Sequence, residues 1–270
     1  MRKRTVLDVP ISDVARVEVD GNPRQIVERA ESGTSTLKTP PGFEADGALS
    51  LELFDAMRSL TADHWVADAD DGTFGLEPPS MSARLSVRKN GRIEEHVLRV
   101  GKATVSGYFA AMQGDTGVFV LPRRVHETLT TLVVDRSLFM MDASITAKVT
   151  LTTSEKSVVF EKRGDEFVQT DTGDQLSPET IQRIMETLAA MRAEAAIELG
   201  PSRPEHGLSH PILTVRLDRE SGVPGDRARV YRIGSGDSYR GVSIHYARAE
   251  GADATYGLLR SSVRAVLDAL

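Results

Sequence analysis

The chain contains no cysteine, which excludes disulfides, thiolate metal sites and cysteine nucleophiles in one step. Aromatic residues make up only 5% of it, and one of them is the single tryptophan. No run approaches the roughly 20 apolar residues that a transmembrane helix needs, and no signal-peptide pattern follows Met1. An excess of basic charge is also missing, because the formal net charge is −6. Nonspecific binding to nucleic acid or to anionic lipid is therefore disfavoured.

The remaining composition is that of an ordinary globular protein. Hydrophobic residues make up 40% of the chain, alongside 22 glycines and 12 prolines, which is enough to bury real cores. A length of 270 residues corresponds to one large domain or two ordinary ones, at about 100–200 residues per domain. The absence of cysteine leaves the redox compartment open.

An internal repeat favours two domains over one. The sequence GLEPP at 75–79 returns as GLSHP at 207–211, and VLRVG at 97–101 returns as VYRIG at 230–234. The offset between the copies drifts only by small steps, at turns, which is typical of duplication followed by loop changes. The positions shared by the two copies, called the repeat motif below, are Gly75, Leu76, Pro79 and Gly101 in the first copy and Gly207, Leu208, Pro211 and Gly234 in the second.

Each copy begins with the same predicted elements. Apolar and polar residues alternate at 15–19 and at 145–151, which predicts half-buried strands, and second strands are expected at 26–29 and 158–162. A long helix follows in each copy. Its predicted apolar face consists of Leu49, Leu53, Met57 and Leu60 in the first copy and of Ile181, Ile184, Leu188 and Met191 in the second.

Three or four further strands and a short helix are expected to close each copy. We therefore predict an α+β fold of two tandem pseudo-repeat lobes, residues 1–137 and 138–270. Each lobe is expected to be a mainly antiparallel sheet, with a long helix and a short C-terminal helix on one face.

The helix starts are best marked in the second copy. Ser177 is a good N-cap, Pro178 suits the first helical position, and Glu179 suits the positive end of the helix dipole. In the first copy, Pro122 is expected to open the short helix.

The repeat motif predicts the backbone conformation at its two turns. Gly75 and Gly207 are each followed by a leucine and a turn proline, which indicates positive φ or close approach of another backbone segment. Leu76 and Leu208 are expected to be buried beside the long helix.

Several segments together resemble a known family. They are FGLEPP at 74–79, the strand that ends at Gly101, GYFA at 107–110 and VFVL at 118–121. The chain resembles an uncharacterised bacterial family, described as a domain of unknown function, whose genes commonly neighbour those of gliding-motility-type ABC transporters. The resemblance is strongest over residues 11–142.

The resemblance implies an extracytoplasmic, periplasmic location with an N-terminal membrane anchor. Here MRKR at 1–4 leads straight into the first strand region, so either the anchor was removed or this member lacks one. The family also tends to carry a tryptophan on the strand before the helix, where this sequence has Leu37 and Val168.

His206 and His210 form the best candidate metal pair. A four-residue spacing aligns two imidazoles only on a helix, whereas Gly207 and Pro211 indicate a turn. We therefore predict a surface turn here rather than a metal site.

Two further segments suggest ligands. DADDG at 68–72 has the look of a calcium loop, but the EF-hand spacing would put Ala67 at its first position, so a solvated acidic turn is favoured. GSGDSYRG at 234–241 follows a strand, but a strand also follows it where a phosphate loop needs a helix. We interpret it as a hairpin loop and predict no cofactor.

Catalytic residues are not predicted. The chain has no Gly-x-Ser-x-Gly elbow and no Ser-x-x-Lys. His64, His96, His126 and His245 fall in different predicted elements and are expected to be surface or half-buried imidazoles. A catalytic set assembled by the fold from distant residues remains the least favoured alternative.

Other conspicuous side chains have structural interpretations. Glu94 and Glu95 are expected on a turn between charged neighbours, where nothing apolar would raise a pKa. Arg123 and Arg124 are expected in a solvated first helical turn, rather than as an anion or partner contact. Trp65 is expected to be an anchor at the edge of the core.

The sequence leads to three hypotheses. The first is a non-enzymatic accessory or scaffold module of the envelope that docks onto an ABC transporter complex, through an exposed apolar patch or an uncovered strand edge. The second is a ligand- or glycan-binding protein that uses an inter-lobe groove, which the low aromatic content disfavours. The third is a hydrolase whose site is invisible in the sequence. The first implies a protein partner, no nucleic acid, and a membrane association that requires an anchor outside this chain.

Overall fold

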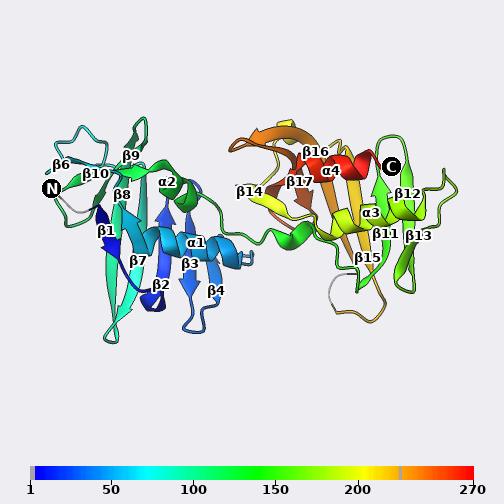
Figure 1. The fold of residues 1–270 in the computed structure, drawn as a ribbon, viewed down its shortest axis with the longest axis horizontal. Coiled ribbons are helices and arrows are strands. Elements are labelled where there is room, and N and C mark those ends of the chain that lie inside the picture. Colours follow the sequence, from blue (N-terminus) through cyan, green and yellow to red (C-terminus); the bar gives the residue numbers. More distant parts are fainter. Residues whose placement is uncertain (1–3, 225–226) are drawn as a thin grey trace. The chain divides into compact units, whose positions relative to one another are not determined.

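The computed structural model describes residues 4–224 and 227–270, and the chain divides into two compact units, Met1–Asp135 and Arg136–Leu270. Each unit contains an eight-stranded sheet in which every strand pair is antiparallel (Figure 1). No helix among the described residues is long and apolar enough to cross a membrane.

In the first unit, the sheet has the strand order β4-β3-β2-β7-β8-β9-β10-β6, and β1 pairs with β5 in a separate two-stranded sheet. The elements of this unit are β1 (Thr5–Asp8), η1 (Ile11–Asp13), β2 (Val14–Asp20), β3 (Gln25–Arg29), β4 (Ser35–Thr39), α1 (Gly47–Arg58), β5 (Ser59–Thr61), β6 (Trp65–Ala67), β7 (Met81–Lys89), β8 (Arg92–Ala103), β9 (Gly107–Met112), β10 (Val118–Pro122) and α2 (Arg123–Leu129).

In the second unit, the order is β13-β12-β11-β15-β16-β17-β18-β14. Its elements are η2 (Ser137–Phe139), β11 (Thr146–Thr152), β12 (Ser157–Arg163), β13 (Glu166–Gln169), α3 (Pro178–Ala189), β14 (Ala193–Leu199), η3 (Pro204–His206), β15 (Leu213–Arg219), β16 (Ala228–Tyr239), β17 (Val242–Ala249), β18 (Ala254–Leu259) and α4 (Arg260–Leu267).

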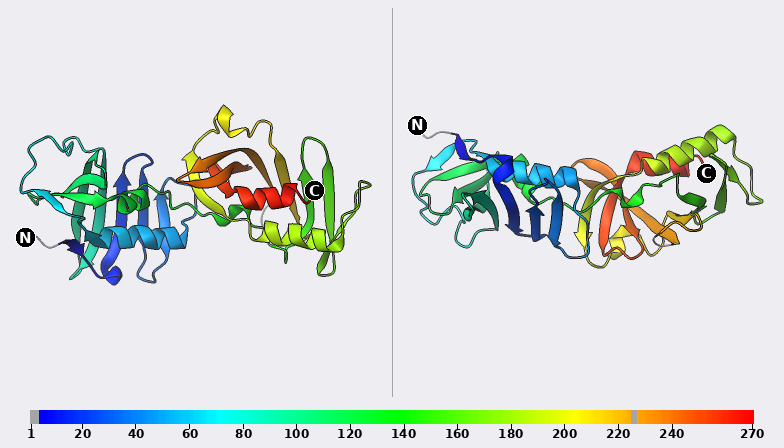
Figure 2. Two further views of the ribbon diagram at one scale, coloured as in Figure 1. Left: turned by 45° about the horizontal axis from the view of Figure 1, so that its top comes forward. Right: turned by 90° about the horizontal axis from the view of Figure 1, so that it is seen from below.

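The two sheets have the same topology, strand for strand. In each, a three-stranded meander is followed by a long helix, and the next strand of that sheet, β6 or β14, pairs at the far edge with the last strand of the unit, β10 or β18. The remaining three strands of each sheet, β7–β9 or β15–β17, fill the space between, and a short helix closes each unit. The prediction of an α+β fold with two similar lobes is confirmed, and two further views show the twist of each sheet (Figure 2).

The cores follow the alternation seen in the sequence. Val17 and Val19 of β2 are fully buried, as are Val149 and Leu151 of β11, while the residues between them face outward. Both are interior strands, paired on either side within their sheets.

The long helices begin where their caps place them. Ser177 accepts a hydrogen bond from the backbone N–H of Thr180 and Pro178 is the first residue of α3, as predicted. Asp46 caps α1 through the N–H groups of Ala48 and Leu49.

The ends of both helices differ from the prediction. Leu60 belongs to β5, because α1 ends at Arg58, and Met191 lies beyond the end of α3. Both side chains are nevertheless buried, which is why their apolar character resembled a continuing helical stripe.

Two expectations about strands and turns were wrong. The segment 234–238 is not a hairpin loop but part of the long strand β16, with a bulge between Ile233 and Gly236; the turn is confined to Arg240 and Gly241, which have positive φ. Glu94 and Glu95 lie on β8 rather than on a turn, where they pair with Lys89 and Arg84. Glycine and charge, which mark turns in sequence, are accommodated in these strands by a bulge and by cross-strand ion pairs.

The edge strands β6 and β14 were not foreseen. β6 has only three residues, Trp65–Ala67. β14 has the sequence AEAAIEL, whose alanines and glutamates suit a helix better than a strand.

Candidate functional site

The repeat motif forms the same contact in both units. In the first, Gly75 has a φ of +74°, and the N–H of Lys102 donates to the carbonyl oxygen of Phe74 at 2.9 Å. This turn lies directly on β8 at Gly101, where an added Cβ would overlap the oxygen of Phe74 and lie 2.9 Å from that of Gly75. Only glycine fits such a close approach between two backbone segments.

In the second unit, Gly207 has a φ of +67°, again positive as predicted. A Cβ on Gly234 would overlap the carbonyl oxygen of His206 and lie 2.9 Å from the carbonyl carbon of Gly207. Pro79 and Pro211, which follow the two turns, are both half-buried just before β7 and β15. The motif therefore fixes a turn to a strand and presents no reactive group.

The two leucines of the motif are buried, Leu76 fully and Leu208 with 6% of its surface exposed. The expected place of Leu76 beside the long helix is wrong, since it packs against Ala111 and Val118 in a cluster without residues of α1. Along β9, Ala111 and Tyr108 point to opposite faces of the sheet. The ring of Tyr108 stacks on that of His126 of α2, with ring centroids 3.8 Å apart. Leu76 thus covers the face of the sheet opposite α2.

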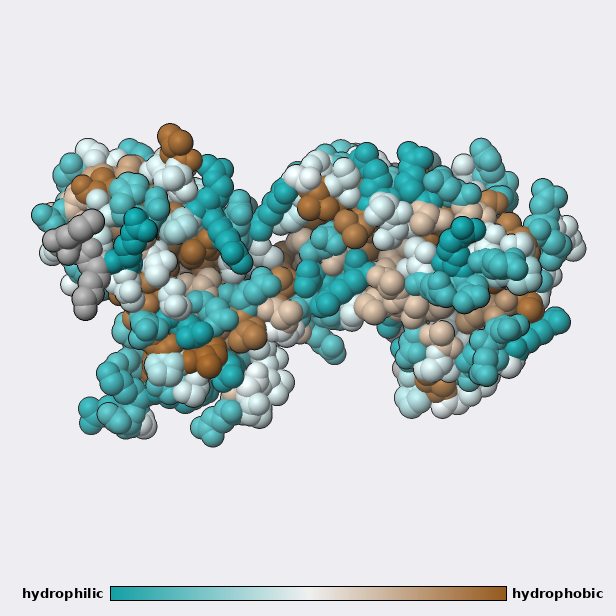
Figure 3. All heavy atoms as spheres, viewed as in Figure 1, coloured by the Kyte–Doolittle hydropathy of each residue, from teal (hydrophilic) through white to brown (hydrophobic). Residues whose placement is uncertain are grey.

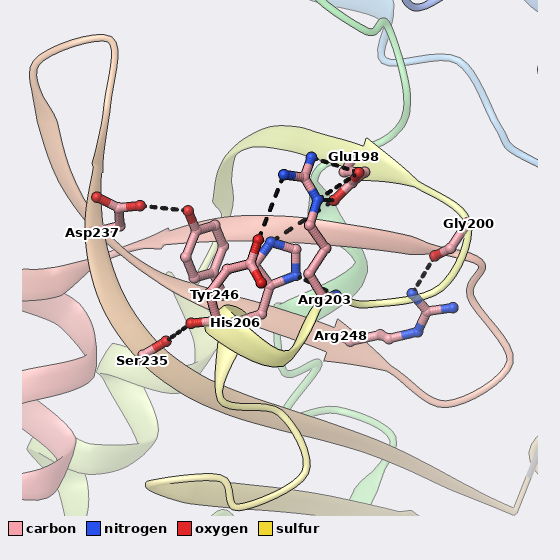
Figure 4. Close-up of polar contacts among 9 residues, drawn as sticks. Glu198, Gly200, Arg203, His206, Ser235, Asp237, Tyr246 and Arg248 are labelled. Carbon is pink, nitrogen blue, oxygen red and sulfur yellow. Dashed lines mark hydrogen bonds and ion pairs between the residues drawn. The ribbon is translucent and has the colours of Figure 1, made fainter.

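A polar cluster surrounds η3 in the second unit (Figure 4). The guanidinium of Arg203 donates from Nε to both carboxylate oxygens of Glu198, at 2.8 and 2.9 Å. These bonds lower the pKa of Glu198. The hydroxyl of Tyr246 donates to Asp237 at 2.6 Å, which raises the pKa of Tyr246 to about 12 and lowers that of Asp237.

His206 lies at the centre of this polar cluster. Its side chain is buried, its Nδ1 accepts a hydrogen bond from the backbone N–H of Arg203 at 3.2 Å, and its ring lies 4.2 Å from that of Tyr246. The surface position predicted for His206 is therefore wrong. His210 is exposed and contacts Ser209, so the two histidines do not form a pair.

The contacts of the polar cluster hold a turn against neighbouring strands. Its hydrogen bonds lower the pKa values of Glu198 and Asp237 and raise that of Tyr246. The hydroxyl of Ser235 donates to the carbonyl oxygen of Glu205. These contacts attach η3 to β14, β16 and β17.

His245 is the second buried histidine, and the expectation of a surface or half-buried ring was wrong for it. Its Nδ1 lies 3.0 Å from the carbonyl oxygen of Gly234, and its buried Nε2 has no hydrogen-bond partner. Burial, together with the charges of Arg260 and Arg264, lowers its pKa. The sequence carried no signal for this burial, because the residues that cover His245 come from other elements.

The remaining sequence candidates lie apart from one another. His64 is exposed beside Asp63, and His96 is half-buried on β8. The acidic residues of 68–72 lie in exposed turns closed by their own side chains, such as the bond from the N–H of Gly72 to Asp70. Among the described residues, no three histidine, aspartate or glutamate side chains gather as metal ligands would.

Arg123, Arg124 and Trp65 lie where the sequence placed them. Both arginines are exposed in the first turn of α2. Trp65 is half-buried on β6 and packs edge-on against Phe119, with ring centroids 5.3 Å apart.

Three surface hollows have different linings. One, of about 490 Å³, contains Arg232 and Arg248, which are already paired with Glu250 and Asp253. A second hollow, of about 450 Å³, lies along β6. The third, called the β13 groove below, has about 490 Å³ and lies between β13 and α3. It is lined by Asp165, Glu166, Phe167, Val168, Gln169, Gln175, Pro178, Ile181, Gln182 and Met185.

The β13 groove and the hollow at β6 share one property. β13 and β6 are terminal strands, each paired on one side only within the described sheets. A terminal strand presents unpaired backbone N–H and C=O groups that can bind another strand. Sequence reasoning anticipated uncovered strand edges in general but did not locate these two.

The fold and these surfaces define an α+β protein of two like lobes with open sheet edges. The family model described as a domain of unknown function, DUF4340, matches residues 36–211. The chain belongs to this family, in agreement with the resemblance to an uncharacterised family. No curated protein and no solved structure matches the chain.

Proposed function

We propose that this protein is a non-enzymatic docking module whose partner is another protein, with an ABC transporter complex as the leading candidate. The observation that carries the proposal is that surface hollows lie along two terminal strands, β6 and β13. Strand edges are common binding surfaces for extended segments of partner proteins.

A strand edge is favoured over an apolar patch as the docking surface. The large hydrophobic side chains that are exposed lie on separate segments: Leu51, Val66, Ile93, Val105, Met140 and Val242. The face drawn in Figure 3 mixes hydrophobic and hydrophilic residues. Single exposed hydrophobic residues of this kind are normal for a protein surface.

The architecture suits a scaffold. We propose that each lobe, 1–137 and 138–270, is one copy of a duplicated unit, with both of its helices on one face of its sheet. In support, α1 contacts α2, and α3 contacts α4. Such a layout leaves the strand edges accessible.

The location follows the resemblance. We propose that the protein works outside the cytoplasm, in the periplasm, tethered to the membrane. Its negative charge offers no attraction to anionic lipid by itself.

Affinity purification tests the partner assignment. The tagged protein is isolated from its own membranes under mild detergent and analysed by mass spectrometry. Stoichiometric recovery of ABC transporter subunits is the expected result. Recovery of no transporter component, together with turnover of a small substrate by the pure chain, would overturn the proposal in favour of an enzyme.

A further inference from the structure

The backbone of β13 has a defined open side. The N–H of Thr170 donates to the carbonyl oxygen of Val159 at 2.9 Å, and the register pairs Val168 with Glu161 and Phe167 with Lys162. Hydrogen-bonded and non-bonded pairs alternate along an antiparallel ladder. The N–H and C=O groups of Phe167 and Gln169 therefore point away from β12, toward the open edge.

The two faces of β13 differ in chemistry. Gln169 lies opposite Phe160, which is fully buried in the core, so Phe167 and Gln169 face the side of α3. Ile181 and Met185 of α3, each 7% exposed, line the groove on this side. A strand added to β13 would place alternate side chains over these apolar residues.

The opposite face is acidic at the edge. Glu166 lies there, since it alternates with Phe167, and Arg163 faces it from β12, on the side away from the open edge. The lining of the groove includes two acids, Asp165 and Glu166, and no lysine or arginine. Across 164–189, the segment that supplies β13 and α3, the acids are Asp165, Glu166, Asp171, Asp174, Glu179 and Glu186, and the single base is Arg183.

These observations indicate which kind of segment the β13 groove would bind. Resting on the docking function proposed above, we propose that the β13 groove binds an extended segment of a partner protein in which apolar residues alternate with lysine or arginine. The segment adds to β13 as a ninth strand, with its apolar side chains over Ile181 and Met185 and its basic side chains beside Glu166.

The pattern of the partner follows from the pleat. Neighbouring side chains of a strand point to opposite faces. One face of β13 lies beside Ile181 and Met185, and the other carries Glu166 next to Val168. Backbone bonds would supply affinity irrespective of sequence, while the two faces would supply selectivity.

A capped synthetic peptide of alternating valine and lysine serves as the probe. It is titrated into the isotope-labelled full chain, and amide resonances are followed by NMR. Shifts confined to Phe167, Gln169, Ile181 and Met185 and their neighbours are expected. A peptide of alternating valine and glutamate should bind about tenfold more weakly or worse, since like charges then meet at the edge.

Two kinds of variant test the separate parts. Reversing both groove acids, Asp165→Lys with Glu166→Lys, should weaken the lysine peptide about tenfold. Glu31→Lys, at an exposed turn of the first unit, is the charge control and should leave affinity unchanged. Methylating the valine amides of the peptide should abolish antiparallel addition, and methylating the lysine amides should abolish parallel addition. Binding that survives both modifications overturns the strand-addition proposal.

The outcomes separate the groove from the general docking function. Peptide shifts confined to β6, β4 or β14 would overturn the assignment to β13 while leaving a docking module in place. A concentration-dependent dimer of the unliganded chain that the acid reversals alter would show a second copy as the occupant, and would also overturn it. Recovery of transporter subunits unaffected by the acid reversals would refute the groove and uphold the docking function.

Discussion

Replacing Gly101 with alanine tests whether the repeat motif is held by backbone contact. The new Cβ would overlap the carbonyl oxygen of Phe74 and approach that of Gly75 to 2.9 Å, so the turn must move by roughly 1 Å to reach ordinary contact. That shift weakens the bond from Lys102 to Phe74, worth about 0.5–1.5 kcal/mol, and overpacking adds about 1–3 kcal/mol. We expect a loss of about 2–4 kcal/mol in the free energy of unfolding.

Trp65 offers a selective assay. It is the only tryptophan and lies on β6 of the first unit, so its fluorescence during urea unfolding reports the unit that contains Gly101. At about 4 °C per kcal/mol for a domain of this size, the thermal midpoint should fall by about 8–16 °C.

Gly47→Ala is the matched control. This glycine begins α1, has open space around its Cβ position and does not have positive φ. Alanine there should be neutral or stabilise by about 0.4–1 kcal/mol. Equal midpoints for Gly101→Ala and Gly47→Ala would refute the close-contact argument. Gly234→Ala should destabilise the second unit to a similar extent, measured by circular dichroism.

Five further substitutions and a pH titration test the second unit. Ser177→Ala removes the α3 cap and should cost about 1 kcal/mol in urea unfolding, a loss that Ser177→Asp should largely avoid. The pKa of His245 is lowered in the folded state, so the unfolded state binds the proton more readily. The free energy of unfolding should therefore be highest above about pH 6.5 and should fall as the pH drops below that value. His245→Gln should flatten this pH dependence. Tyr231→Phe removes a buried hydroxyl without a partner and should be neutral or stabilising, whereas Tyr246→Phe removes the bond to Asp237 and should be destabilising in the same assay.

The sequence predicted what depends on local pattern. Alternation located β2 and β11, and the cap at Ser177 located the start of α3. The duplication anticipated a shared topology, because equal spacing of strands and turns leaves few other ways to bury both apolar faces. The short edge strand β6 and the alanine-rich β14 escaped detection, since their pairing with distant strands outweighs their local propensity.

The polar features were harder to foresee for the same reason. His206 is buried by Tyr246, which lies far along the chain, so the turn around it gave no hint of its environment. The β13 groove depends on the side-by-side placement of a strand and a helix that are separated by a loop. Periodicity within one segment carries no record of such neighbours.

In each sheet, the fourth strand along the chain, β6 or β14, pairs with the last one, β10 or β18. This pairing has a consequence for fragments and for synthesis. A fragment cut at residues 36 and 211, the limits of the family match, would keep β4 without β3 and β14 without β18, and we expect it to aggregate through those exposed strands. On the ribosome, the sheet of the first lobe can close while the second is still being made. The second must wait for β18, after which only α4 remains, so the nascent chain carries an open sheet until translation is nearly finished.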